Sequence, residues 1–200
     1  MGSKDKIEAD LILWYQRKVM FGNDYQTDLV FGEAKSFRGE NPKERRAIQD
    51  AFQTEDIERM KRLAIRFPGA VLVFSTMKQA NEFSKAEIDR ITNLAEWGRE
   101  YVRELRETRA PVIVLTSTEL FAPYSLRETW RTIAGKHAEF ANAGWPRLDN
   151  LRVLANLTQQ LYLGMPSYGT WLNEKWKKKA AKRELRKAAI QAPSSVSTNI

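Results

Sequence analysis

The sequence predicts an α/β fold in which a mixed central sheet is flanked by helices and followed by a mostly helical C-terminal part. Three observations lead to this prediction. Segments 8–22 and 28–37 are rich in β-branched and aromatic residues, which indicates extended structure. Apolar runs without alternation occur at 70–74 and 111–116, as in strands that are buried on both faces. In most of the sequence between and after these runs, apolar residues recur at the spacing that is typical of an amphipathic helix.

The N-terminal part is predicted to form three strands. Segment 8–22 reads as two extended pieces, and a turn at 22–24 separates it from a third strand, "DLVFGEAKSF", at 28–37. The short connections favour hairpins among these strands. The polar segment 38–46, which contains glycine and proline, is predicted to be a loop.

Amphipathic helices are predicted after this loop, because helix-start signals precede periodic apolar residues. The starts are Thr54 with two acids after it, Ser84 with Glu87, and Ser125 with Glu128. The second helix is expected to continue as far as Leu105, and two more helices are expected around 147–163 and 168–190. We therefore expect an α/β core at 7–122, a helical extension at 123–190 that ends in a basic helix, and a disordered tail at 191–200.

The charge distribution points to a polyanionic partner. The net charge is +8, and segment 171–190 holds eight Lys/Arg against two Glu. This segment is either a solvated basic helix without a binding role or, in the functional interpretation, an arm that contacts the phosphates of a nucleic acid. In the functional interpretation the nucleic-acid-binding residues are Lys175, Lys177, Lys178, Lys179, Lys182 and Arg183. Trp171 and Trp176 lie among these lysines, where they either stack on bases or pack the helix.

Other composition features narrow the class of protein. No apolar run approaches the roughly 20 residues of a membrane span, so no membrane partner is expected. Cysteine is absent, which excludes disulfides and thiolate metal sites. No secretory signal is visible, so we expect a cytoplasmic protein, with further domains of a larger chain as candidate partners.

Acidic and basic residues recur on one side of the predicted strands. Glu33 and Lys35 share a face of their strand, whereas Asp28 has the opposite parity and should point away. Glu8 and Asp10 share a face of the first strand and can converge on Glu33 if the strands pair. Converging carboxylates repel each other unless a cation lies between them, and oxygen ligands favour Mg²⁺ or Mn²⁺.

In this order of elements the chain resembles the PD-(D/E)XK nuclease superfamily, which includes restriction-endonuclease-like enzymes and archaeal Holliday-junction resolvases. The resemblance rests on Asp10 at a strand start, "EAK" at 33–35 on a later strand, and the helix and buried strand that follow. It covers residues 8–75, about a third of the chain. It implies a restriction-endonuclease-like core and an endonuclease that hydrolyses DNA phosphodiester bonds with Mg²⁺ or Mn²⁺.

The resemblance also implies roles for individual residues. Asp10 and Glu33 correspond to the metal ligands, the Ala34 carbonyl to a backbone ligand, and Lys35 to the residue that positions or polarises the attacking water. Glu8 is a candidate extra acid. The family's first helix has no counterpart in the few residues before the first strand, and Ala9 stands where the family has proline before the acid.

Alternatives remain open at this point. The same fold can serve as a catalytically inactive nucleic-acid-binding or scaffolding module, and Glu33 with Lys35 can be a surface ion pair. A small-ligand domain is a third interpretation, because Ser75, Thr76 and 116–118 follow the two buried strands. Basic residues of the first helix either line a phosphate track or form its wet face: Arg59, Lys61, Arg62 and Arg66. His137 is expected to be a core or boundary residue.

Overall fold

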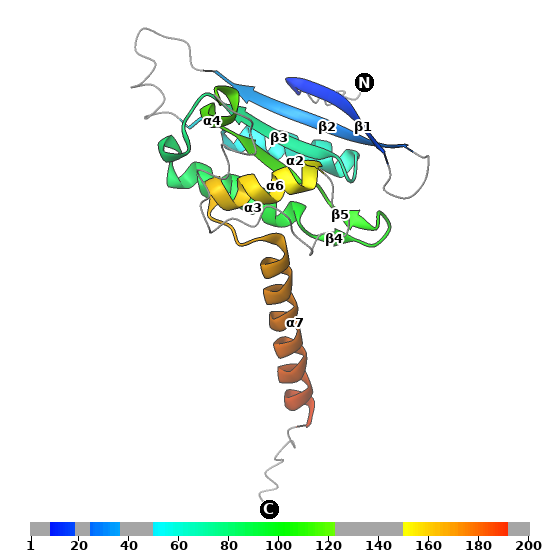
Figure 1. The fold of residues 1–200 in the computed structure, drawn as a ribbon. Coiled ribbons are helices and arrows are strands. Elements are labelled where there is room, and N and C mark those ends of the chain that lie inside the picture. Colours follow the sequence, from blue (N-terminus) through cyan, green and yellow to red (C-terminus); the bar gives the residue numbers. More distant parts are fainter. Residues whose placement is uncertain (1–8, 19–24, 37–49, 123–149, 192–200) are drawn as a thin grey trace, which may run out of the picture.

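A computed structural model of the chain describes residues 9–18, 25–36, 50–122 and 150–191. Its centre is a mixed four-stranded sheet with the order β1-β2-β3-β6 (Figure 1). The strands are β1 (Leu11–Lys18), β2 (Tyr25–Lys35), β3 (Val71–Thr76) and β6 (Val112–Leu115). β1 pairs antiparallel with β2, whereas the β2/β3 and β3/β6 pairs are parallel. The predicted mixed sheet is confirmed.

Helices cover both faces of this sheet (Figure 1). The helices are α2 (Thr54–Arg66), α3 (Lys85–Gly98), α4 (Ser117–Leu120), α6 (Asn150–Leu163) and α7 (Tyr168–Gln191), with a 3₁₀ turn at Ala80–Glu82. Alternation along β2 assigns the faces. Phe31 lies in the main hydrophobic cluster with α2 and α3, whereas Val30 packs with Ala155 of α6 in a second cluster. The carboxyl ends of β2 and β3 therefore lie at one edge of a three-layered core.

Several element boundaries differ from those predicted. Within the described part of segment 8–22 there is one strand, β1, rather than two extended pieces. The N-cap of α2 is Gln53, so Thr54 is its first helical residue. The helix expected to continue to Leu105 ends at Gly98, and a small hairpin of β4 (Tyr101–Val102) and β5 (Glu107–Thr108) follows. The predicted start at 125–128 and His137 lie outside the described residues, as do residues 192–200 of the predicted tail.

Gly98 ends α3 at a point where the chain leaves no room for a side chain. A Cβ built on Gly98 would overlap the carbonyl oxygen of Ala110, whose N–H donates to the Gly98 carbonyl at 3.1 Å. We expect Gly98→Ala to lower the free energy of unfolding by about 1–3 kcal/mol, although the same change in an open helix is stabilising. Asn93→Ala, on the exposed side of α3, is the control and should be neutral or slightly stabilising in denaturant titrations. Equal stability of the two variants would contradict the close approach.

α7 leaves the body of the protein as a long projecting helix (Figure 1). Its base is fixed by Arg99, which donates from Nε to Gln159 Oε1 at 2.7 Å and from Nη1 to the Pro166 carbonyl at 2.9 Å. Burial lowers the pKa of Arg99 to about 10, so this guanidinium stays charged at neutral pH. Side chains 173–187 are exposed on every side of the helix. None of the helices in the described ranges is long and apolar enough to cross a membrane.

Candidate functional site

Glu33 and Lys35 lie on the same face of β2, as predicted, and α2 covers that face. Two residues of α2, Asp56 and Arg59, are three positions apart and so project from one side of the helix. Lys35 Nζ lies 2.7 Å from Glu33 Oε1 and 3.1 Å from Asp56 Oδ1. Arg59 Nη2 lies 2.5 Å from the same Glu33 oxygen and 2.8 Å from the same Asp56 oxygen. These four residues, which we call the charge quartet, form a closed ring of two acids and two bases.

The charge quartet lies at the carboxyl edge of two parallel strands, because Glu33 pairs in register with Phe74 and Lys35 with Thr76 of β3. Glu33 is buried, with 2% of its side chain exposed, whereas about a third of Lys35 and a quarter of Arg59 reach solvent. Glu33 Oε2 is buried and has no hydrogen-bond partner among the described residues. The quartet therefore places a carboxylate oxygen that can still accept a hydrogen bond or bind a cation beside the partly exposed side chains of Lys35 and Arg59.

The contacts within the quartet shift the pKa values of Asp56, Lys35 and Arg59 toward their charged forms. Burial alone would raise the pKa of Asp56, but hydrogen bonds from the Gln53 N–H, Lys35 and Arg59 outweigh it and hold this pKa below its ordinary value. Burial alone would lower the pKa of Lys35, but the adjacent Glu33 and Asp56 outweigh it and raise this pKa. The hydrogen bond to Glu33 raises the pKa of Arg59. Lys35 therefore carries a positive charge at neutral pH in this arrangement.

A second buried ion pair holds the segment that leads into α2. The Glu87 carboxylate of α3 accepts hydrogen bonds from the N–H groups of Ala51 and Phe52, at 2.7 and 3.1 Å, through Oε1. Its other oxygen lies 3.1 Å from Nζ of Lys78, which follows β3. Ser84 caps α3, as predicted, and accepts from the Glu87 N–H. Glu87 thus fixes the entry to the helix that carries half of the charge quartet.

Asp10 lies beside β2 but contacts its backbone rather than the charge quartet. Its exposed carboxylate accepts a hydrogen bond from the Ala34 N–H at 2.8 Å. The register of β1 and β2, with Leu11 opposite Gly32, places Asp10 next to Glu33 at the end of the ladder. Among the described residues, no three or more Asp, Glu, His or Cys side chains are close enough together to hold a metal ion. Glu8 lies outside the described residues, so the roles of Asp10, Glu8 and the Ala34 carbonyl stay predictions.

Sequence reasoning missed Asp56 and Arg59 as members of the site. From sequence alone Asp56 is one of the two acids in the first turn of a helix, and Arg59 belongs to the wet face or phosphate track of that helix. One signal was present: Asp56 lies beside the apolar stripe that Ile57 and Met60 begin, and it is buried with them. An acid adjacent to a buried stripe needs a partner across the interface. Asp28, by contrast, points away from the quartet, as its parity predicted, and pairs with Arg152 of α6 at 3.1 Å.

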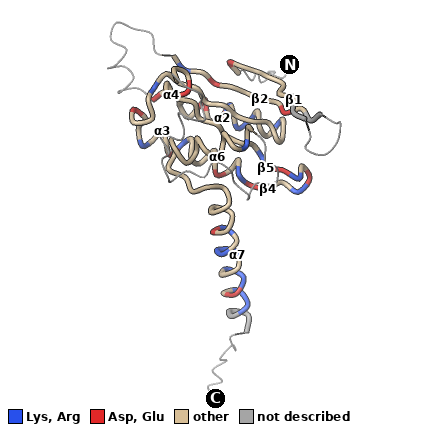
Figure 2. The backbone as a smooth tube through the Cα atoms, in the orientation of Figure 1, with Lys and Arg blue, Asp and Glu red and all other residues tan. Residues whose placement is uncertain are grey.

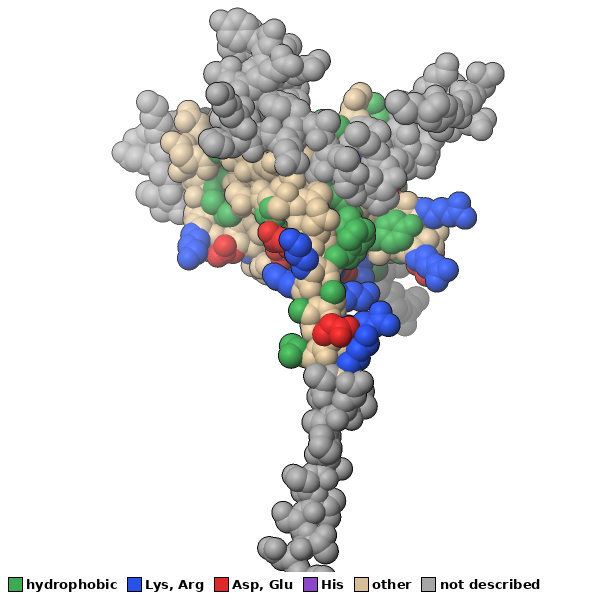
Figure 3. Space-filling model, turned by 60° about the horizontal axis from the view of Figure 1, so that its bottom comes forward, with side chains coloured by type: hydrophobic (Ala, Val, Ile, Leu, Met, Phe, Trp, Pro, Cys, Tyr) green, Lys and Arg blue, Asp and Glu red, His purple; other side chains and the backbone are tan. Residues whose placement is uncertain are grey.

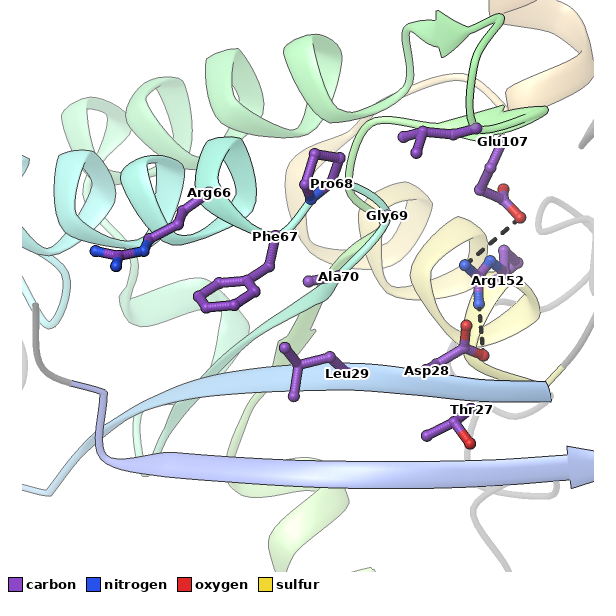
Figure 4. A pocket seen from close by; sticks show the side chains of 11 residues that line it. Thr27, Asp28, Leu29, Arg66, Phe67, Pro68, Gly69, Ala70, Glu107 and Arg152 are labelled. Carbon is purple, nitrogen blue, oxygen red and sulfur yellow. Dashed lines mark hydrogen bonds and ion pairs between the residues drawn. The ribbon is translucent and has the colours of Figure 1, made fainter.

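Asp28 and Arg152 line a pocket at the amino ends of β2 and β3 (Figure 4). The pocket has a volume of about 390 Å³ and is also lined by the turn between α2 and β3. Arg152 is fully buried and lies between Asp28 and Glu107 of β5, 3.6 Å from the Glu107 carboxylate. Asp28 and Glu33 are five positions apart along β2, a distance of about 16 Å. The pocket is therefore separate from the charge quartet.

The basic residues of α7 remain exposed. Figures 2 and 3 show Lys and Arg along this helix, interrupted by single acids. Lys175 is tied to the body through Glu100, at 3.3 Å, and lies 4.8 Å from the ring centroid of Trp171. Trp176 is 61% exposed, whereas Trp171 packs against Tyr168 at the helix base. The other predicted nucleic-acid-binding residues are exposed on the helix: Lys177, Lys178, Lys179, Lys182 and Arg183.

Comparisons with known proteins identify no relative. No protein-family model matches the sequence, and searches of curated proteins and of solved structures give no match. The functional argument therefore depends on the chain's own residues and their geometry.

Proposed function

We propose that this chain is a metal-dependent nuclease domain that hydrolyses DNA phosphodiester bonds. The observation that carries the proposal is the buried Glu33 carboxylate, with an unpartnered oxygen, beside Lys35 at the carboxyl edge of β2 and β3. The position of "EAK" on β2, with α2 and β3 after it, is the part of the element order on which the resemblance rests, and it supports the proposal. In this proposal Asp10, Glu33 and the Ala34 carbonyl serve as metal ligands, with Glu8 as a further acid.

The residues present fit a hard divalent cation such as Mg²⁺ or Mn²⁺. A buried carboxylate oxygen without a partner is costly unless a cation or donor meets it, and Mg²⁺ typically takes one or two protein carboxylates together with waters and phosphate oxygens. When bound, such an ion stabilises charge on the phosphoryl group and lowers the pKa of a bound water. Lys35, whose Nζ lies 2.7 Å from Glu33 Oε1, would donate toward the attacking water or a phosphate oxygen.

Metal-dependent nicking of a plasmid tests this proposal. We expect the wild-type protein to nick supercoiled DNA with Mg²⁺ or Mn²⁺ and to be inactive with EDTA. Glu33→Gln, which keeps the shape of the side chain, should remove the activity, and Glu33→Ala should do the same. Salt-sensitive DNA binding without cleavage by the wild type would overturn the nuclease proposal. That result would favour the second candidate, an inactive nucleic-acid-binding module on the same fold, which the neutral and internally paired charge quartet favours.

Both candidates assign DNA contacts to α7, and the salt dependence of binding tests this. We expect the triple variant Lys178→Ala, Lys179→Ala, Lys182→Ala to reduce the slope of log K against log [salt] by about 2–3, since each phosphate contact contributes about 0.9. The matched control removes three exposed basic residues elsewhere: Lys85, Arg103 and Arg106. Both triple variants lose the same net charge, so an equal effect of the two would contradict a specific role of α7. Fluorescence anisotropy between 50 and 200 mM salt measures the slopes.

A further inference from the structure

The charge quartet holds two cationic nitrogens between the same pair of carboxylate oxygens. Glu33 Oε1 and Asp56 Oδ1 each contact both Lys35 Nζ and Arg59 Nη2, at distances of 2.5–3.1 Å. Two oxygens that share one nitrogen at these distances lie close enough to share one metal ion after a small movement. Asp56 is mostly buried and is fixed by its bond from the Gln53 N–H at 2.9 Å. It is thus a preorganised second carboxylate beside Glu33.

Arg59 contacts the two acids of the quartet through only one of its three guanidinium nitrogens. Both of its contacts with the acids are made by the single nitrogen Nη2. Its Nε is buried and has no hydrogen-bond partner in the described part of the chain. The two-pronged pairing that gives arginine its strongest carboxylate contacts is therefore not formed. About a quarter of this side chain is exposed, which gives the guanidinium a path out to solvent.

The net charge of the quartet indicates that one of its two bases must move away when a divalent cation binds. The two acids and two bases of the quartet sum to zero, so a metal ion that bound with both bases in place would leave an excess of two positive charges. Like charges at such short range repel strongly in a partly buried site. One base must therefore move. Both bases contact the acids through a single nitrogen, but only Arg59 also keeps a buried nitrogen, Nε, without a partner, so Arg59 is the base that gains hydrogen bonds by leaving.

We propose that Asp56 is a metal ligand together with Glu33, and that the Arg59 guanidinium occupies the position of the metal ion until the ion displaces it. This inference rests on the proposed function for the identity of the site. It adds two residues that the family resemblance does not supply. Asp10 contacts the Ala34 N–H rather than the quartet, so Glu33 and Asp56 would be the two carboxylates that hold this ion, with waters and phosphate oxygens completing its coordination.

Mn²⁺ binding without DNA tests the inference. Isothermal titration calorimetry, with free Mn²⁺ followed in parallel by electron paramagnetic resonance, gives the dissociation constant. We expect Arg59→Met to tighten Mn²⁺ binding by about tenfold or more, because a competing positive charge is removed. We expect Asp56→Asn to weaken it by about 10–100-fold. Arg62→Met, on the exposed side of the same helix, is the matched control and should leave the dissociation constant unchanged.

The possible outcomes separate this inference from the proposed function. A gain of affinity in Arg59→Met cannot come from misfolding, so it supports the inference even where Asp56→Asn is destabilised. Unchanged Mn²⁺ affinity in Arg59→Met, or absence of binding in both wild type and Arg59→Met, overturns it. Mn²⁺ binding with the expected pattern but no DNA cleavage would overturn only the nuclease proposal. Metal-dependent cleavage with Mn²⁺ affinity that is insensitive to both residues would overturn only the inference.

Discussion

Replacing Lys35 with alanine is expected to lower the rate of metal-dependent plasmid nicking by about 10²–10⁴-fold, the usual scale for a positioned electrostatic or proton-donating group. Lys35 Nζ lies 2.7 Å from Glu33 Oε1, and about a third of the side chain is exposed at the edge where a phosphate would approach. Its neighbouring acids raise its pKa, so it presents a positive charge at neutral pH. Initial nicking rates at saturating Mg²⁺ measure the effect.

The structural role of Lys35 can be separated from a catalytic one. Arg59 also contacts Glu33, at 2.5 Å, so the buried carboxylate keeps a cationic partner when Lys35 is removed. We therefore expect the melting temperature of Lys35→Ala to change little. Lys85→Ala, at an exposed position of α3, is the control and should nick DNA at the wild-type rate. A folded Lys35→Ala variant with near wild-type activity would remove Lys35 from the mechanism.

The sheet was predictable from sequence because its signals are local. The apolar runs at 70–74 and 111–116 correspond to β3 and β6, since strands buried on both faces need apolar residues at every position. The end of α3 was not predictable in this way. Apolar periodicity continues beyond Gly98, but there the chain turns into the β4–β5 hairpin, and Arg99 is buried against Gln159 of α6 and Tyr168 at the start of α7. Such a boundary depends on contacts about 60 residues away in sequence.

In the candidate site, too, the features that depend on local sequence were predictable, and those that depend on long-range packing were not. The shared face of Glu33 and Lys35, and the opposite direction of Asp28, follow from strand alternation alone and are confirmed. Asp56 and Arg59 join the site only because α2 docks on that face, which brings together residues more than twenty positions apart. Helical spacing shows that these two residues share a side of the helix. It does not show which strand residues they meet.

Replacing Lys78 with methionine is expected to lower the free energy of unfolding by about 3–5 kcal/mol, the scale for breaking a buried ion pair by removing one partner. The side chains of Lys78 and Glu87 are 1% and 0% exposed, and Nζ lies 3.1 Å from Glu87 Oε2. Methionine fills a similar volume but leaves the Glu87 carboxylate buried without this cation. Denaturant titration measures the change. Lys175→Met, which removes a half-exposed pair with Glu100, should cost less than about 1 kcal/mol.

A double variant tests whether charge, rather than shape, explains that loss. In Lys78→Met/Glu87→Gln the glutamine oxygen can still accept from the N–H groups of Ala51 and Phe52, and both charges of this pair are removed. We expect it to be more stable than Lys78→Met alone, with a coupling of about 1–3 kcal/mol. Additive effects, or a single variant within about 0.5 kcal/mol of wild type, would contradict a buried ion pair. Because Ala51 and Phe52 lead into α2, their amide exchange should speed up in Lys78→Met and recover in the double variant, which would show that this pair holds the helix carrying Asp56 in place.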